Sequence, residues 1–298
     1  MSAATVGFDG SGQDGAFVWW EPGQMRVDAL RDALDNVHVG QFLPKASTVP
    51  AAIKEMLDGF LSAANLRIRG LPIAINPLAS EVRGCEAVQR RPGKQTNDFT
   101  HVISVVLDEQ ADRIRIASHN PAFFSMPNKT VVEDRMTAVY RQQIDWYPTT
   151  MVSACLARVI DHLGGVLCRA NGGVYYLPES SLQTFEPLAN ALECAEGELS
   201  ITITRFTLTP GERSYRLVAQ AMEREANDTL LQVEDALKSI GRQRQDGRVS
   251  RTELLTGLAE KVKRYGEILN QPMAHMLDAI AKCQEAVDAH SAIEDLTL

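Results

Sequence analysis

The sequence lacks the short motifs that usually identify a P-loop protein, a serine hydrolase or a zinc protease. It contains no Walker A pattern and no G-x-S-x-G nucleophile elbow, and its six histidines form no H-E-x-x-H pair. The glycine-rich run GFDGSGQDG carries two aspartates, whose charge would repel a phosphate group. We therefore expect a protein without a metal or a cofactor, and a non-enzyme in preference to an enzyme.

Cysteine is scarce and unpaired. The 298 residues include five cysteines, and none of them forms a C-x-x-C pair. This spacing argues against a disulfide framework or a zinc cluster. No apolar run is long enough to span a membrane, and the N-terminus lacks the basic and apolar segments of a secretory signal. We therefore expect a cytoplasmic protein with reduced thiols and no membrane contact. The cysteines are Cys85, Cys155, Cys168, Cys194 and Cys283.

The chain has fewer basic than acidic residues. The formal net charge is -8, which argues against unspecific nucleic-acid binding by the whole surface, so any such contact needs a local patch. Hydrophobic residues make up 45% and charged residues 23% of the chain, as in ordinary soluble globular proteins. The length is close to the size at which a single core divides into domains.

Two periodicities alternate in the first half of the chain. Apolar residues recur at steps of three and four in residues 25–37 and 49–62, which predicts two helices. Residues 71–116 instead carry short apolar runs, and FTHVISVVL and RIRIAS alternate apolar and polar residues. We expect these runs to form a small antiparallel sheet, because the loops between them are short.

Residues 131–177 have the order helix, turn, helix and hairpin. Thr130 and Glu133 have the spacing of a capping box, which predicts the start of the first helix. Asn171-Gly172 predicts a tight hairpin turn. A winged helix has this order, but the second helix offers only one arginine to DNA phosphates. We therefore predict a winged-helix-like module that packs on the protein or contacts another one.

The C-terminal third has the clearest pattern. Residues 209–212, TPGE, form a helix start with a capping residue, a first-turn proline and an acid. Apolar residues then recur at the spacing of a coiled-coil seam, with a polar interruption near residue 245. We predict two long antiparallel helices, the second bent at Pro272. The apolar positions are Tyr215, Val218, Met222, Ala226, Leu230, Val233, Leu237, Ile240, Leu254, Leu258, Val262, Tyr265, Leu269, Met273, Met276, Ile280, Cys283 and Val287.

These patterns together predict an α+β fold in three parts. Residues 1–15 form a flexible tail. Residues 16–208 form an α+β head with a small antiparallel sheet, packed helices and the winged-helix-like module. Residues 209–298 form a long antiparallel coiled-coil helical hairpin.

Cations gather where the two C-terminal helices are joined. The stretch GRQRQDGRVSR contains four arginines and one acid. We expect Gly241 to end the first helix, Gly247 to turn the chain and Ser250 to cap the second helix. The cations would then lie at the tip of the hairpin. They are Lys238, Arg242, Arg244, Arg248 and Arg251.

Three interpretations of these cations stay open. The tip can be a solvated surface, in which Lys238 complements the negative end of the helix dipole. Arginine also pairs bidentately with phosphate or carboxylate, so the tip can bind a nucleic-acid backbone or an acidic protein surface. Five cations neutralise few phosphates, and nucleic-acid binding would therefore be weak and strongly dependent on salt.

A few aromatic and histidine residues are further candidates. Trp19 and Trp20 are adjacent and can anchor on a partner or on the core of the chain itself. His101 lies on the apolar side of a predicted strand, where we expect a hydrogen-bonded core histidine. His119 follows a strand end, and it is the position at which an enzymatic site would be sought.

The sequence therefore predicts a non-enzymatic binding or scaffold component of a larger protein assembly of bacterial or phage type. The helical hairpin would contact a protein partner or a second copy of the chain. One alternative is a nucleic-acid-binding protein that uses the arginine-rich hairpin tip. Another is an enzyme with an unrecognised site in the head.

Overall fold

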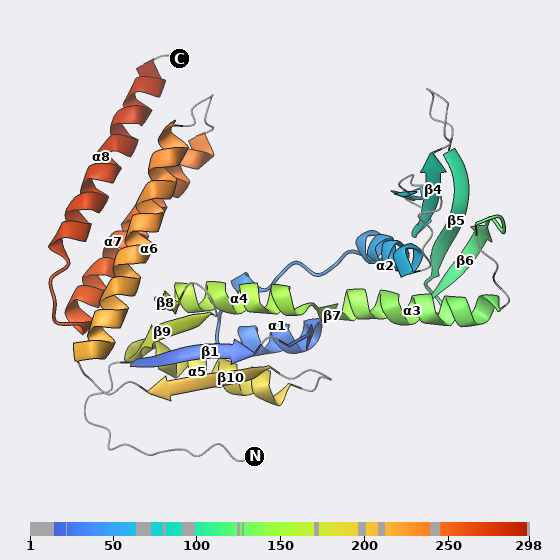
Figure 1. Cartoon of the computed structure of the whole chain (residues 1–298), viewed down its shortest axis with the longest axis horizontal. Helices are drawn as coiled ribbons and strands as arrows, with labels where there is room; N and C mark the ends of the chain where they lie inside the picture. Colours follow the sequence, from blue (N-terminus) through green and yellow to red (C-terminus); the bar gives the residue numbers. More distant parts are fainter. Residues whose placement is uncertain are drawn as a thin grey trace.

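The chain folds as an α+β protein with three hydrophobic cores. In the computed structural model the three cores follow one another in a U-shaped arrangement (Figure 1). The structure describes residues 15–21, 23–63, 73–79, 82–90, 99–123, 126, 128–169, 173–195, 201–207, 212–238 and 245–296. Residues 1–14 of the predicted tail lie outside this set.

The first core lies under a four-stranded antiparallel sheet with the strand order β10-β1-β9-β8. Ala16 and Val18 of β1 point to this core, and so does Ile203 of β10. The sequence analysis missed β1, which pairs with β9 and β10. The strands are β1 (Gly15–Glu21), β8 (Val166–Arg169), β9 (Val174–Pro178) and β10 (Thr202–Thr207). The packed helices are α1 (Val27–Asp35), α4 (Thr149–His162) and α5 (Glu179–Cys194), with the short η1 (Gly40–Phe42) beside them.

The second core contains the predicted small antiparallel sheet, with the strand order β3-β4-β5-β6. Its helices, α2 and α3, pack against buried residues such as Ile103 and Ile114. The strands are β3 (Ile73–Pro77), β4 (Gly84–Arg90), β5 (Phe99–Asp108) and β6 (Arg113–His119). The helices are α2 (Val49–Ala63) and α3 (Lys129–Asp145). The short strands β2 (Met25–Arg26) and β7 (Trp146–Tyr147) pair in antiparallel fashion. The pair lies between the first core and the second core.

Side chains of α3 close the edge of this sheet. The Glu133 carboxylate accepts a hydrogen bond from the Ile116 N–H at 2.8 Å, and the Thr137 hydroxyl accepts one from the Ile114 N–H at 3.0 Å. The predicted capping box is therefore wrong, because Glu133 serves the sheet. Asn128 caps the helix instead and accepts a hydrogen bond from the Val131 N–H. Satisfied edge N–H groups protect a sheet from pairing with another chain.

The winged-helix-like interpretation of residues 131–177 is not supported. The predicted order of helix, helix and hairpin is present, since β8 and β9 pair in antiparallel fashion. However, α3 packs in the second core and α4 in the first, and the two helices follow each other end to end (Figure 1). The segment is therefore not one packing unit, and residues 16–208 hold two cores.

The C-terminal region consists of three helices, which we call the bundle. They are α6 (Glu212–Lys238), α7 (Gln245–Ile268) and α8 (Ala274–Leu296). The predicted second helix does not continue through Pro272 but ends at Ile268. A turn with Asn270 at φ +46° precedes the proline, which cannot supply a backbone N–H to a continuing helix. At its other end α7 begins at Gln245, so Gly247 and Ser250 are helical and do not form the predicted turn and cap.

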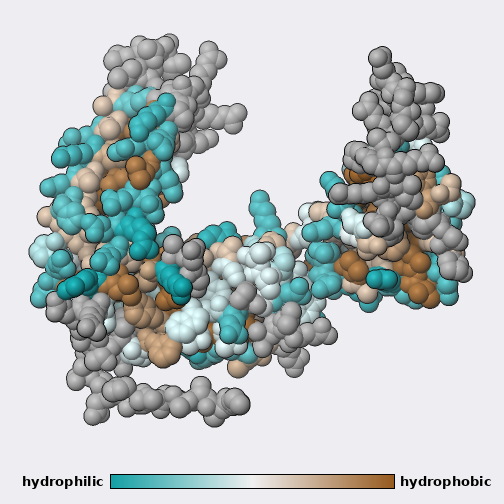
Figure 2. Space-filling model, viewed as in Figure 1, coloured by the Kyte–Doolittle hydropathy of each residue, from teal (hydrophilic) through white to brown (hydrophobic). Residues whose placement is uncertain are grey.

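Two arms project from the same side of the molecule. The bundle forms one arm and the second core, which includes α3, forms the other, with the first core between them (Figure 1). The space between the arms is open in the space-filling view (Figure 2). None of the helices in the described part of the chain is both long and apolar enough to cross a membrane.

The edge closure by Glu133 can be tested by stability measurements. Glu133→Ala leaves the buried Ile116 N–H without an acceptor, and we expect the free energy of unfolding to fall by about 1–3 kcal/mol. Glu133→Gln keeps an oxygen acceptor and should lose less. The adjacent Asp134→Ala removes a 63% exposed carboxylate that pairs with Arg113, and it should cost less than about 1 kcal/mol. Urea unfolding of the three variants measures this order, and equal losses for Glu133→Ala and Asp134→Ala would contradict it.

Candidate functional site

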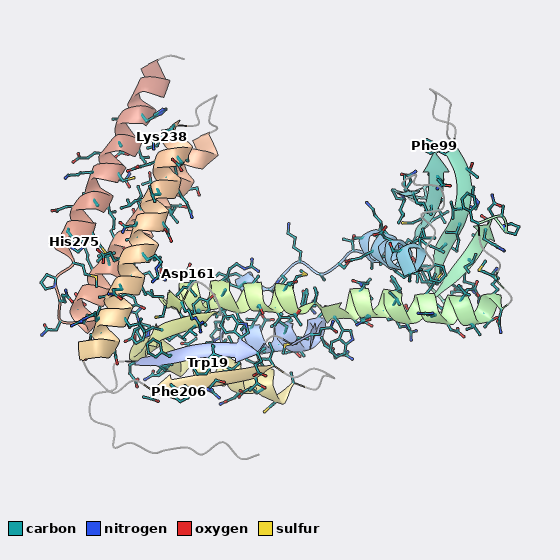
Figure 3. All side chains as sticks on the ribbon, in the orientation of Figure 1. Trp19, Phe99, Asp161, Phe206, Lys238 and His275 are labelled. Atoms are coloured by element: carbon teal, nitrogen blue, oxygen red, sulfur yellow. The ribbon has the colours of Figure 1, made fainter. Side chains whose placement is uncertain are left out.

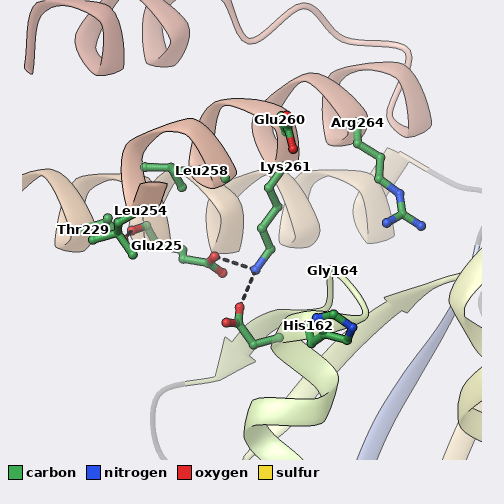
Figure 4. A pocket seen from close by; sticks show the side chains of 11 residues that line it. His162, Gly164, Glu225, Thr229, Leu254, Leu258, Glu260, Lys261 and Arg264 are labelled. Atoms are coloured by element: carbon green, nitrogen blue, oxygen red, sulfur yellow. Dashed lines mark hydrogen bonds and ion pairs between the residues drawn. The ribbon is translucent and has the colours of Figure 1, made fainter. Parts of the chain in front are cut away.

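A polar hollow lies where the bundle meets the first core. It has a volume of about 680 Å³ and opens between α6 and α7 on one side and the C-terminal end of α4 on the other (Figure 4). We call it the groove, and we call its charged end, around Lys261, the foot. The groove is lined by Asp161, His162, Gly164, Glu225, Thr229, Leu254, Gly257, Leu258, Glu260, Lys261 and Arg264.

Lys261 is the centre of an ion triad at the foot. Its Nζ lies 2.6 Å from the Glu225 carboxylate and 2.9 Å from the Asp161 carboxylate (Figure 4). The lysine side chain is only 11% exposed, whereas that of Asp161 is 74% exposed. The triad therefore ties both α7 and α6 to the end of α4, and it carries one net negative charge.

Burial changes the acidity of Glu225. Removal from water raises the pKa of its carboxyl above the ordinary value, and the neighbouring Lys261 ammonium opposes this rise. The lysine therefore favours the ionised form of the Glu225 carboxyl. Without this cation, the pKa of the buried Glu225 carboxyl would rise further.

Hydrogen bonds and an aromatic contact fix the bundle beside the triad. The Tyr265 hydroxyl donates a hydrogen bond to the Gly164 carbonyl at 2.8 Å, and its ring packs edge-on against Tyr176 of β9. The Arg264 guanidinium donates to the hydroxyls of Ser180 and Ser181 at the start of α5. These contacts orient α7 relative to the first core and give the groove a fixed lower wall.

The upper part of the groove combines apolar side chains with Thr229 (Figure 4). Leu254 of α7 is 47% exposed, although it lies beside the buried Leu258. One turn further on, a Cβ atom built at Gly257 would meet no other atom within 4 Å. The groove thus has a mainly apolar, uncrowded upper part and a charged foot.

The lysine in the groove and two cysteines of the neighbouring cores are engaged or buried. Lys261 is engaged by two carboxylates and is not a free nucleophile. Burial raises the pKa of Cys155 to about 11 and that of Cys168 to about 12, so neither thiol forms a thiolate near neutral pH. Within the described residues, no three His, Cys, Asp or Glu side chains lie close enough together to hold a metal ion.

A protein-family model covers most of the chain, including the groove. The model described as "Family of unknown function (DUF6744)" matches residues 84–294. The chain belongs to this family. The match runs from β4 to α8 and contains every residue that lines the groove. Comparisons with curated proteins and with solved structures found no match.

Lys238, where the predicted arginine-rich tip begins, lies at the end of the bundle that is farther from the first core (Figure 3). Lys238 is exposed and lies 3.4 Å from Asp235 (Figure 3). Arg242 and Arg244 lie outside the described residues, and Arg248 is in α7 with its side chain outside them. Arg251 is half-buried, and its Nε atom has no hydrogen-bond partner among the residues that the structure describes. Of the described tip residues, Lys238 lies away from the groove, whereas Arg251 precedes the groove residue Leu254 by three positions in α7.

The two predicted anchor tryptophans have different surroundings, because successive residues of a strand point to opposite faces. Trp20 stacks on Tyr175 and donates its indole N–H to the Ser153 hydroxyl, so it packs on the first core. Trp19 lies on the other face, where it stacks on Phe206 at 5.1 Å (Figure 3). Phe206 is 58% exposed.

The histidines that the sequence singled out lie in the second core's sheet. The Nε2 atom of His101 is 2.8 Å from the Ser104 hydroxyl and 3.3 Å from the Ser118 hydroxyl. This confirms a hydrogen-bonded histidine in a half-buried position. His119 is the last residue of β6 and does not line the groove.

Sequence reasoning missed the triad. Asp161, Glu225 and Lys261 are separated by 64 and 36 residues and belong to three different helices. No local spacing relates them. A usable signal was the position of Glu225 and Lys261 beside the predicted seam. Glu225 immediately precedes the seam residue Ala226, and Lys261 immediately precedes the seam residue Val262, in two helices predicted to be antiparallel.

The contribution of Lys261 can be measured by thermal and urea unfolding. Lys261→Met leaves the partly buried Glu225 carboxylate without its cation, and we expect a loss of about 2–4 kcal/mol near pH 7. Asp161→Asn should lose less than about 1 kcal/mol, because Asp161 is exposed. Lys263→Met, an exposed lysine of the same helix, is the matched control.

The loss in Lys261→Met should also depend on pH. A carboxyl with a raised folded-state pKa binds its proton more tightly when folded, so its contribution to stability grows as the pH falls toward the ordinary value of 4.5. The loss of unfolding free energy in Lys261→Met should therefore become smaller as the pH falls from about 7 to about 5. The double variant Lys261→Met with Glu225→Gln should lack this pH dependence. A deficit that is constant with pH would contradict the role given to Glu225.

Proposed function

We propose that the protein is a non-enzymatic binding or scaffold component of a larger cytoplasmic protein assembly. The bundle would contact its partner through the groove. The observation that carries this proposal is the exposed Leu254 beside the open position at Gly257, above a charged foot. An apolar centre with a polar rim is the usual arrangement of a protein-protein contact.

Further exposed leucines on the bundle support a binding role. Leu217 and Leu231 of α6 are 42% and 56% exposed. They are 14 residues apart, close to four helical turns, and so lie on one side of the helix. Figure 2 shows apolar atoms between hydrophilic ones on the visible face of this arm. Helices that expose apolar side chains in register commonly dock on other helices.

Site-specific photo-crosslinking in the native cell tests the proposed function. A photoreactive phenylalanine at position 254 should give a discrete adduct with one protein, because Leu254 would contact the partner. The same group at position 131 is the control, since Val131 is 59% exposed on α3, far along the chain from the groove. A Cβ atom at position 257 would meet no other atom within 4 Å, so Gly257→Gln adds a side chain at the groove and should reduce the adduct at least about tenfold. Equal, diffuse labelling at both positions would contradict the proposal.

The charge of the arginine-rich tip, residues 238–251, favours one second candidate, the binding of nucleic acid. The tip holds five cations and one acid, a net charge of +4, so the remainder of the chain carries -12. Fluorescence anisotropy with short DNA and RNA across a salt series tests this. If phosphates bind the tip, the affinity should fall steeply with salt and disappear when Arg242, Arg244 and Arg248 are changed to glutamine. Binding that is unchanged in this variant would exclude the tip as the contact.

A further inference from the structure

The two edges of the second core's sheet differ in how their backbone groups are satisfied. At the β6 edge, Thr137 and Glu133 of α3 accept hydrogen bonds from backbone N–H groups. The other edge is β3, which has β4 on one side and no strand of the described chain on the other. Within the described residues, no side chain is bonded to the backbone of Ile73 or Ile75. An edge strand whose backbone groups are unpaired is a template for a further strand.

The register of β3 and β4 identifies the backbone groups of β3 that face outward. The Leu78 N–H donates to the Gly84 carbonyl at 2.9 Å, and hydrogen-bonded pairs alternate with non-bonded pairs along an antiparallel ladder. Residues two and four positions before Leu78 therefore bond to β4, whereas Ile73 and Ile75 present both N–H and C=O to the edge. Pro77 is the next outward-facing position, and proline is tolerated there because its missing N–H is not needed by β4.

A hollow of about 590 Å³, which we call the edge hollow, lies beside these groups, between β3 and α2. Ile73 and Ile75 form its strand side, where they pack partly buried against the second core. Exposed side chains of α2 form the other side, with the acids Glu55 and Asp58 and the single cation Lys54. The edge hollow thus combines an apolar side with a helix wall of net charge -1. Its lining residues are Ala51, Lys54, Glu55, Asp58, Ile73, Ala74 and Ile75.

A strand added to β3 would direct every second side chain into the edge hollow. Residues that lie opposite each other in a ladder point to the same face of the sheet, so the residues opposite Ile73 and Ile75 point toward α2. Long basic side chains match both sides of the edge hollow. Their methylene stems cover the apolar strand side, and their charged ends reach Glu55 and Asp58.

We propose that the β3 edge and the edge hollow bind an extended segment of a partner protein, which adds to the sheet as a further strand and carries lysine or arginine at alternate positions. Backbone hydrogen bonds to Ile73 and Ile75 supply the affinity, and the acids of α2 supply the preference for basic residues. The edge hollow belongs to the second core, whereas the groove belongs to the bundle in the other arm (Figure 1). The inference therefore goes beyond the function proposed for the bundle.

Selection of a displayed library of random peptides on the full chain tests this proposal, and fluorescence anisotropy then measures the affinity of an enriched peptide for each variant. Ile75→Pro removes one outward N–H and no bond to β4, and Ile75→Val is the matched control that keeps this N–H. The charge variant carries Glu55→Lys and Asp58→Lys. Its control carries Asp32→Lys and Asp228→Lys, which change the same number of exposed acids in α1 and α6.

The enriched peptides should carry lysine or arginine at every second position. Their affinity should fall at least about tenfold in Ile75→Pro and in the charge variant, and should stay at the wild-type value in both controls and in Gly257→Gln. N-methylation of the peptide at the alternate residues that face β3 should abolish binding. N-methylation at the intervening residues should not, because only one edge of an added strand pairs with β3. Circular dichroism checks that all variants are folded.

Several outcomes would overturn the proposal. They are a selection that enriches no peptide, peptides that bind Ile75→Pro as tightly as Ile75→Val, and equal tolerance of the two methylation patterns. Peptides without basic residues that bind the charge variant as they bind the wild type would overturn the chemistry assigned to the edge hollow. Peptides whose binding is lost in Gly257→Gln and kept in Ile75→Pro would overturn this inference while supporting the groove of the bundle as the binding surface.

Discussion

The position of the bundle depends on a sheet that is buried on both faces. Val18 and Leu177 point from this sheet into the first core, while Tyr176 and Val166 point from the other face into the bundle core. Successive side chains of a strand point to opposite faces of the sheet, so a shift of the sheet in one core also displaces side chains in the other. The groove is formed at the margin of this shared sheet, and its shape follows from how α7 is seated there through Tyr265.

The ion triad is the polar counterpart of this junction. A lysine that is 11% exposed has lost most of its hydration, and two carboxylates replace the lost water. Such a pair adds little net stability compared with apolar residues, but it penalises any arrangement in which one partner is missing. It therefore selects one seating of α6 and α7 against α4. The two acids also differ in exposure: the Asp161 carboxylate faces solvent, while the Glu225 carboxylate is mostly buried and holds α6 against α7.

Periodicity predicted the elements well and their tertiary partners poorly. The helices α2 and α3 and the sheet β3–β6 were predictable, because their apolar spacing and short loops are local properties. Strand β1 was not, since its partners in β9 and β10 lie more than 150 residues away and its tryptophans suggested an anchor. Glu133 had the correct spacing for a cap, yet an edge N–H of β6 competed for it. The groove residues come from three helices, so only the folded chain brings them together.

The break at Pro272 decides which side of the bundle stays open. A continuous second helix would leave the α6–α7 pair with a similar open furrow on each side. Because the chain turns at residues 269–273, α8 folds back and covers one of them: His275 reaches Glu223 of α6, and Gln284 reaches Thr252 of α7. The furrow that remains is the groove, with Leu254 and Gly257 on its wall. The apolar seam residues beyond the proline, such as Met276 and Ile280, thus fill the bundle's own core, and the residues left for a partner lie on the opposite side of α7.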